Sequence, residues 1–155
     1  MTKLPSIPVA PRVDDRGLRP AVTIAPSSPL HQAARIMRAH DISALVVGRP
    51  GELVSIVTER DLTQAQADGL APGTAVSAVA SSDPLTVPPD ATVLDAAMLM
   101  LRHGVRHLIV AHGRRAIGVL SMRDVLEALV AAVTPDTILV MLEQVRIDPS
   151  ELWLG

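Results

Sequence analysis

A hydroxyl residue is followed three positions later by an aspartate at two places, each where an apolar run passes into helical periodicity. The copies are Thr58-Glu59-Arg60-Asp61 and Ser121-Met122-Arg123-Asp124. A hydroxyl at a helix N-terminus lies beside free backbone N–H groups, which favour anionic oxygens. A carboxylate in the first helical turn can accept hydrogen bonds from the vicinal hydroxyls of a ribose, and the arginine beside it can bind phosphate as a bidentate fork. The pattern therefore indicates nucleotide binding.

The same spacing also fits a capping box, in which the hydroxyl and the acid satisfy only the helix N-terminus. A single copy does not decide between these interpretations. Two copies at equivalent places of a duplicated unit favour ligand binding.

The elements that would position these motifs are themselves repeated. Shifted by 63 positions, residues 22–62 match residues 85–125 without a gap, with Thr23 on Thr86 and Met37 on Met100. Each copy predicts a strand, a helix of apolar period three to four, two further strands and a second helix. The predicted division is an N-terminal arm (1–18, with loose packing expected through residue 20), a first unit (19–66), a linker (67–81), a second unit (82–132) and a C-terminal helix and tail (133–155).

Composition limits the function further. The chain is 48% hydrophobic and 1% aromatic, carries a formal net charge of −2 and has no cysteine. This argues against nucleic-acid binding by stacked aromatics, thiolate metal sites and disulfides. No apolar run reaches the roughly 18–20 residues of a membrane span, and no signal peptide is recognisable, so a cytoplasmic location is expected. Common catalytic motifs are missing, so neither an enzyme nor a bound cofactor is expected.

The segments Ile56-Val57-Thr58-Glu59-Arg60-Asp61-Leu62 and Gly118-Val119-Leu120-Ser121-Met122-Arg123-Asp124-Val125 resemble those of the cystathionine β-synthase (CBS) domain family. The resemblance covers about residues 19–130. It implies an α/β (α+β) fold: a Bateman module of two tandem βαββα units related by a pseudo-twofold axis. It also implies two symmetric clefts, each able to hold AMP, ADP, ATP or a related adenosyl ligand.

In that family each cleft is shared between the units, which carries over to this sequence as two residue sets. One set joins Ser121, Arg123 and Asp124 to Thr23, Ile24, Ser43 and Ala44. The other joins Thr58, Arg60 and Asp61 to Thr86, Val87, Arg106 and His107. Main chain near Ala44 or His107 would bind the adenine edge. Gly118 stands where the first copy has Ser55, so the Asp124 cleft is expected to have more room.

Two functions follow as hypotheses. The first is a non-catalytic regulatory module that binds an adenine nucleotide and transmits its occupancy to a regulated partner protein. The second is a structural or interaction module of the same fold without ligand. A homodimer is expected in either case, because one unit alone cannot cover the apolar faces of its helices and relatives pair as discs.

Overall fold

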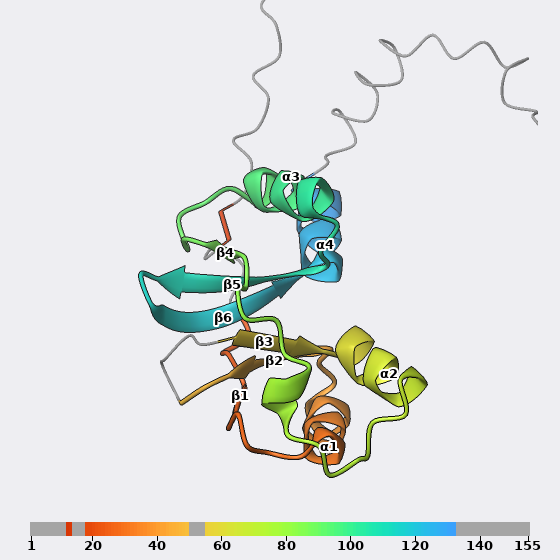
Figure 1. The fold of residues 1–155 in the computed structure, drawn as a ribbon. Coiled ribbons are helices and arrows are strands. Elements are labelled where there is room, and N and C mark those ends of the chain that lie inside the picture. The colour runs from red at the N-terminus through yellow and green to blue at the C-terminus, as the bar shows by residue number, and fades with distance from the viewer. Residues whose placement is uncertain (1–11, 14–17, 50–54, 133–155) are drawn as a thin grey trace, which may run out of the picture.

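The computed structural model describes residues 12–13, 18–49 and 55–132, and within them the chain forms two three-stranded sheets that face each other (Figure 1). The first unit contains β1 (Thr23–Ile24), α1 (Leu30–His40), β2 (Ala44–Val47), β3 (Ser55–Thr58) and α2 (Glu59–Ala67). The second contains β4 (Thr86–Val87), α3 (Val93–His103), β5 (His107–His112), β6 (Arg115–Ser121) and α4 (Met122–Ala132). The predicted βαββα order is confirmed in both copies.

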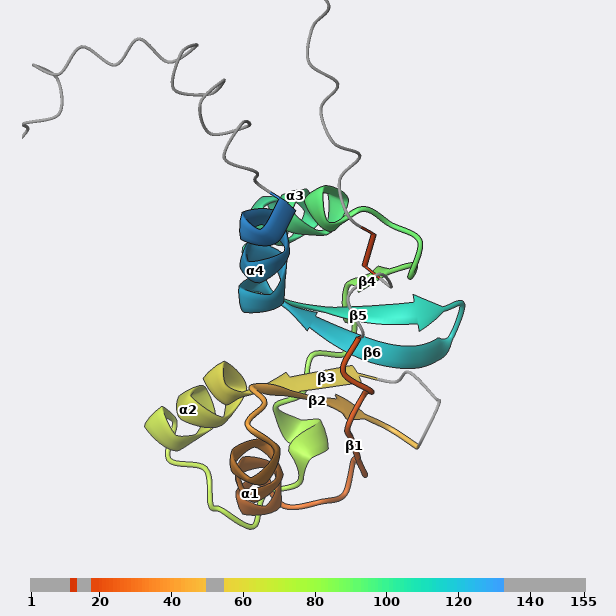
Figure 2. The same cartoon turned by 180° about the vertical axis from the view of Figure 1, so that it is seen from behind.

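The two sheets have the same topology. β1 runs parallel to β2, which is antiparallel to β3, and β4, β5 and β6 repeat this arrangement. Seen from either side, the helices cover the outer face of each sheet and leave the inner faces toward each other (Figures 1 and 2). The βαββα unit thus produces four layers when it is duplicated.

The core divides according to the period of two along each central strand. In β2, Leu45 and Val47 pack under the helices of the first unit, whereas Ala44 and Val46 face the other sheet. All four residues are buried, because the strand is covered on both faces. The cluster between the sheets contains six buried residues: Ala44, Val46, Ile56, Ile109, Ala111 and Ala116.

Each unit also receives one valine from the segment that precedes the other unit. Val13, which comes before β1, is 0% exposed within the core of the second unit, and its N–H donates to the Ala91 carbonyl at 3.0 Å. Val76, which comes before β4, is 0% exposed within the core of the first unit, and its N–H donates to the Ser28 carbonyl at 2.7 Å. The same 63-residue offset relates both pairs. Each unit therefore packs against the segment that leads into the other unit, and we call these two segments, which precede β1 and β4, the entering segments.

This exchange shows that the predicted N-terminal arm is not loosely packed throughout, and that part of the predicted linker belongs to the first unit. The arm was expected to pack loosely, yet Val13 is part of a core. The linker contains a 3-10 turn (Val76–Ala78, η2) that packs into the first unit. Val13 is an isolated apolar residue in a proline-rich stretch, so no periodicity revealed its burial.

The space beside Gly118 is filled by the same entering segment. A Cβ atom at Gly118 would lie 3.0 Å from the Arg19 carbonyl oxygen and 3.4 Å from the Leu18 Cβ atom. The Ala21 N–H donates to the Ile117 carbonyl at 3.3 Å, which holds this segment along β6. The expectation that Gly118 makes room for a ligand is therefore wrong: the glycine lets the chain's own backbone approach.

Candidate nucleotide site between the two units

Both predicted motifs form capping boxes. At the start of α2, the Thr58 N–H and hydroxyl each donate to Asp61 Oδ2 at 2.7 Å, and the Asp61 N–H donates to Thr58 Oγ1 at 3.4 Å. At the start of α4, the Ser121 N–H and hydroxyl donate to Asp124 Oδ2 at 2.7 and 2.6 Å, and the Asp124 N–H donates to Ser121 Oγ at 3.2 Å. The structural interpretation of the motif thus holds for both copies.

A third capping box shows that this geometry alone does not identify a binding site. Thr92 and Asp95 make the same three contacts at the start of α3, where Thr92 is half-buried and Asp95 is exposed. The spacing in Thr92-Val93-Leu94-Asp95 is the same as in the two predicted motifs. What separates the three copies is their position in the fold.

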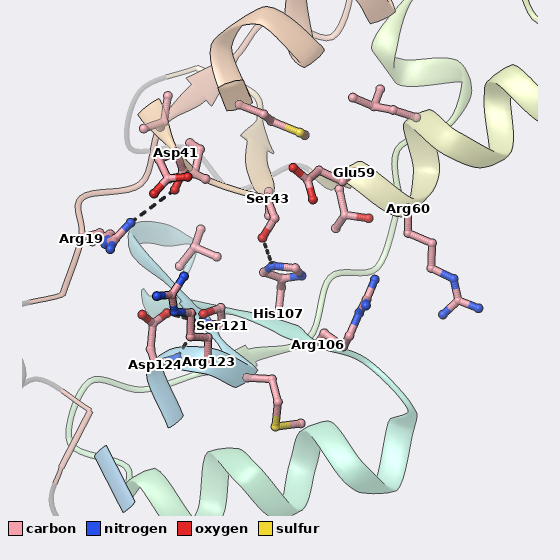
Figure 3. A pocket seen from close by; sticks show the side chains of 18 of the residues that line it. Arg19, Asp41, Ser43, Glu59, Arg60, Arg106, His107, Ser121, Arg123 and Asp124 are labelled. Carbon is pink, nitrogen blue, oxygen red and sulfur yellow. Dashed lines mark hydrogen bonds between the residues drawn. The ribbon is translucent and has the colours of Figure 1, made fainter. Parts of the chain in front are cut away.

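That position is beside a cavity of about 840 Å³ between the two units. The starts of α2 and α4 reach it from opposite units, and Figure 3 shows Glu59 and Arg60 across from Ser121, Arg123 and Asp124. Neither Thr92 nor Asp95 belongs to its lining. The cavity is therefore where two of the three helix N-termini could contact a ligand.

The cavity brings together nine of the residues predicted for the two clefts: Ser43, Ala44, Thr58, Arg60, Arg106, His107, Ser121, Arg123 and Asp124. Among the described residues, seven predicted ones do not line it: Thr23, Ile24, Ser55, Asp61, Thr86, Val87 and Gly118. Ile24 and Val87 are buried in the helix-side cores of their units instead. The described cavity thus combines parts of both predicted clefts, and it includes Asp124 but not Asp61.

Several lining residues were missed by the sequence reasoning. Arg19 reaches the cavity from the entering segment and donates to the Asp41 carbonyl oxygen at 3.4 Å. Val22 and Glu59 also line it. Val22 and Glu59 lie directly beside predicted residues, but Arg19 carried no motif, and only the exchange of entering segments brings it here.

A hydrogen bond crosses the middle of the cavity, where Ser43 Oγ and His107 Nε2 are 2.7 Å apart (Figure 3). Ser43 precedes β2 of the first unit and His107 begins β5 of the second. Burial, aided by the positive charge of Arg106, lowers the pKa of His107 below its ordinary value of 6.5, against the opposing effect of nearby carboxylates. The neutral imidazole is therefore the favoured form at pH 7.

No group of three or more metal-ligating side chains occurs in the part of the chain that the structure describes. Across those same ranges, no helix is long and apolar enough to cross a membrane.

Comparison with known proteins identifies the family. A model of the CBS domain matches residues 13–68 and 76–131. A 111-residue match, 35% identical, covers 70% of this chain but only 22% of an inosine-5′-monophosphate dehydrogenase from Korarchaeum cryptofilum. The fold is a tandem pair of βαββα units. The chain belongs to the CBS domain family, as the resemblance predicted.

Two solved structures are similar over nearly their whole length. A CBS-domain containing protein from Agrobacterium tumefaciens is 30% identical with a TM-score of 0.72, and the match covers 79% of this chain and 96% of that one. A CBS domain protein from Pyrobaculum aerophilum, solved in complex with AMP, is 27% identical with a TM-score of 0.68, and the match covers 83% and 96%.

Proposed function

We propose that this chain is a non-catalytic regulatory module that binds AMP, ADP or ATP in the cavity between its units and transmits the occupancy to a partner protein. The observation that carries the proposal is the arrangement of Ser121 and Asp124, at the start of α4, across the cavity from Ser43 and Ala44 of the other unit. The AMP complex of the Pyrobaculum aerophilum relative supports the same ligand class.

Each part of a nucleotide has a partner in this arrangement. Asp124 Oδ2 is occupied by the capping contacts, but among the described residues no donor reaches Oδ1, so Oδ1 accepts hydrogen bonds from the ribose. The small side chains of Ser43 and Ala44 let the adenine approach the main chain. The phosphate binds at the N-terminus of α4 beside Arg123.

Such a ligand contacts both units at once. A ligand shifts a conformational equilibrium only when it binds the two states with different affinity. Contacts from opposite sides of the cavity supply that difference, because a change in the distance between the units alters all of them together.

The first test is a thermal-shift measurement with AMP, ADP and ATP. Ligand at about 100 times its Kd is expected to stabilise the folded chain by roughly 2.7 kcal/mol, which raises the Tm. GTP and NAD serve as comparison ligands.

The ligand-free interaction module is the second candidate, because all three capping boxes are satisfied by the chain itself. An unchanged Tm with every adenine compound at millimolar concentration would support this candidate against nucleotide binding.

The second prediction is a homodimer formed through α3 and α4. Five large apolar side chains on these helices are exposed: Leu94, Met98, Leu101, Leu126 and Val130. The equivalent residues of the first unit are His31, Arg35, Arg38, Thr63 and Ala67. Since only the second unit carries large apolar residues at these positions, a twofold contact between second units would bury them.

Light scattering at tens of micromolar is expected to give twice the mass of the chain. Leu101→Glu, at a side chain that is 68% exposed, is expected to halve that mass. Arg35→Glu, at an equivalent face of the first unit, is the control and should leave it unchanged. A monomer in the unmodified protein refutes the dimer.

A further inference from the structure

The charges around the cavity are unbalanced in favour of anions. Five arginines are among the residues that line it, Arg19, Arg38, Arg60, Arg106 and Arg123, against three acidic residues, Asp41, Glu59 and Asp124. Arg123 also pairs with Glu127 at 3.1 Å, but both side chains are exposed, and such surface pairs are weak. Arg123 is therefore available to a stronger anionic partner.

The Ser43–His107 contact places a titratable group within this positive lining. It joins residues 64 positions apart, from the two different units, whereas the capping boxes join residues three apart. The carboxylates that influence His107 lie on the other elements around it: Asp124 on α4, and Glu59 and Asp61 on α2. Arg106 lies next to it in the chain. Ser43 thus holds the imidazole ring between groups of both signs.

Building on the proposed function, we infer that the cavity selects adenine nucleotides that carry phosphate over uncharged or cationic adenosyl compounds, and that His107, oriented by Ser43, takes up a proton when the phosphate binds.

The physical reason is the change in charge around the imidazole. In the free protein, burial and Arg106 keep the pKa of His107 low, so the ring is mostly neutral. A phosphate in the cavity adds negative charge, which favours the imidazolium and raises the pKa. Because the complex then binds more protons than the free protein, affinity must rise as the pH falls between the two pKa values. The gain is at most about tenfold for each unit of pKa change.

The nucleotide's own titration acts in the opposite direction. The second ionisation of a phosphate monoester has a pKa of about 6, so lowering the pH also removes ligand charge. Adenosine lacks the phosphate and therefore isolates the contribution of the nucleoside. The comparison between protein variants, each measured with the same ligand, isolates the contribution of His107.

The test is titration calorimetry with AMP and with adenosine at about pH 8 and about pH 6.5, in buffers of different ionisation enthalpy. For AMP we expect net proton uptake that His107→Gln abolishes, because glutamine can still contact Ser43 but does not titrate. Ser43→Ala is expected to reduce the uptake while adenosine still binds. His103→Gln, at an exposed position outside the cavity, is the matched control and should retain full uptake.

Selectivity is measured with the same calorimeter. AMP is expected to bind at least about tenfold more tightly than 5′-methylthioadenosine and S-adenosylmethionine, since a charge-assisted hydrogen bond to phosphate contributes about that factor or more. If 5′-methylthioadenosine or S-adenosylmethionine binds as tightly as AMP, or if His107→Gln shows the same proton uptake as the unmodified protein, this inference is overturned and the proposed function still stands. Failure of every adenine compound to bind overturns both.

Discussion

Asp124→Ala is expected to weaken AMP binding at least about tenfold, and by more than Asp61→Ala does. Each charge-assisted hydrogen bond to the ribose contributes roughly 1.5–3 kcal/mol, so the loss of one suffices for this effect. Asp124 lines the cavity and Asp61 does not. The strand start opposite Asp124 carries the small residues Ser43 and Ala44, whereas the start of β5 carries the bulkier Arg106 and His107.

The third capping box provides the control for this experiment. Asp95→Ala removes the same contacts to a threonine at a helix N-terminus and is expected to cost about 1 kcal/mol of stability without changing the affinity for AMP. Calorimetry on the three variants, with circular dichroism to verify the fold, separates capping from binding. An equal or larger loss from Asp61→Ala would show that the other half of the cavity holds the nucleotide.

Val13→Ala is expected to destabilise the module by about 2–3 kcal/mol, although it lies in the segment that sequence reasoning assigned to a loose arm. The side chain is 0% exposed, so the substitution loses roughly 0.8 kcal/mol for each buried methyl and leaves a cavity behind. For a domain of this size, that change lowers the Tm by roughly 5–10 °C. Thermal and urea unfolding measure it.

Two other valines provide the comparison. Val76→Ala, at the equivalent position in the first unit, is expected to cost a similar amount because Val76 is also 0% exposed. Val130→Ala, at a side chain that is 64% exposed within the chain, should change stability by less than about 0.5 kcal/mol when it is measured in the Leu101→Glu background, in which the predicted dimer contact does not form. If Val13→Ala is as mild as Val130→Ala, the exchange of entering segments does not stabilise the fold.

Local pattern was enough to predict the elements of this protein and the order in which they occur. Apolar residues at helical spacing identified α1 and α3, and short apolar runs identified β2 and β5, because these patterns follow from which face of each element is buried. Because the unit is duplicated, each helix or strand predicted in one copy was also predicted in the other. The motif spacing predicted the site residues at the starts of α2 and α4, whereas the resemblance to the CBS domain family implied those at the starts of β2 and β5. Nine of the predicted site residues line one cavity.

Tertiary structure decided what the local pattern left open. A capping box satisfies its helix wherever the helix lies, so the spacing of Thr58, Thr92 and Ser121 from their aspartates was the same at the cavity and away from it. The burial of Val13 and the position of Arg19 depend on a segment that crosses to the other unit. Gly118 faces backbone from a segment about 100 residues earlier in the chain. These contacts join residues far apart in sequence, and no periodicity within a short window records them.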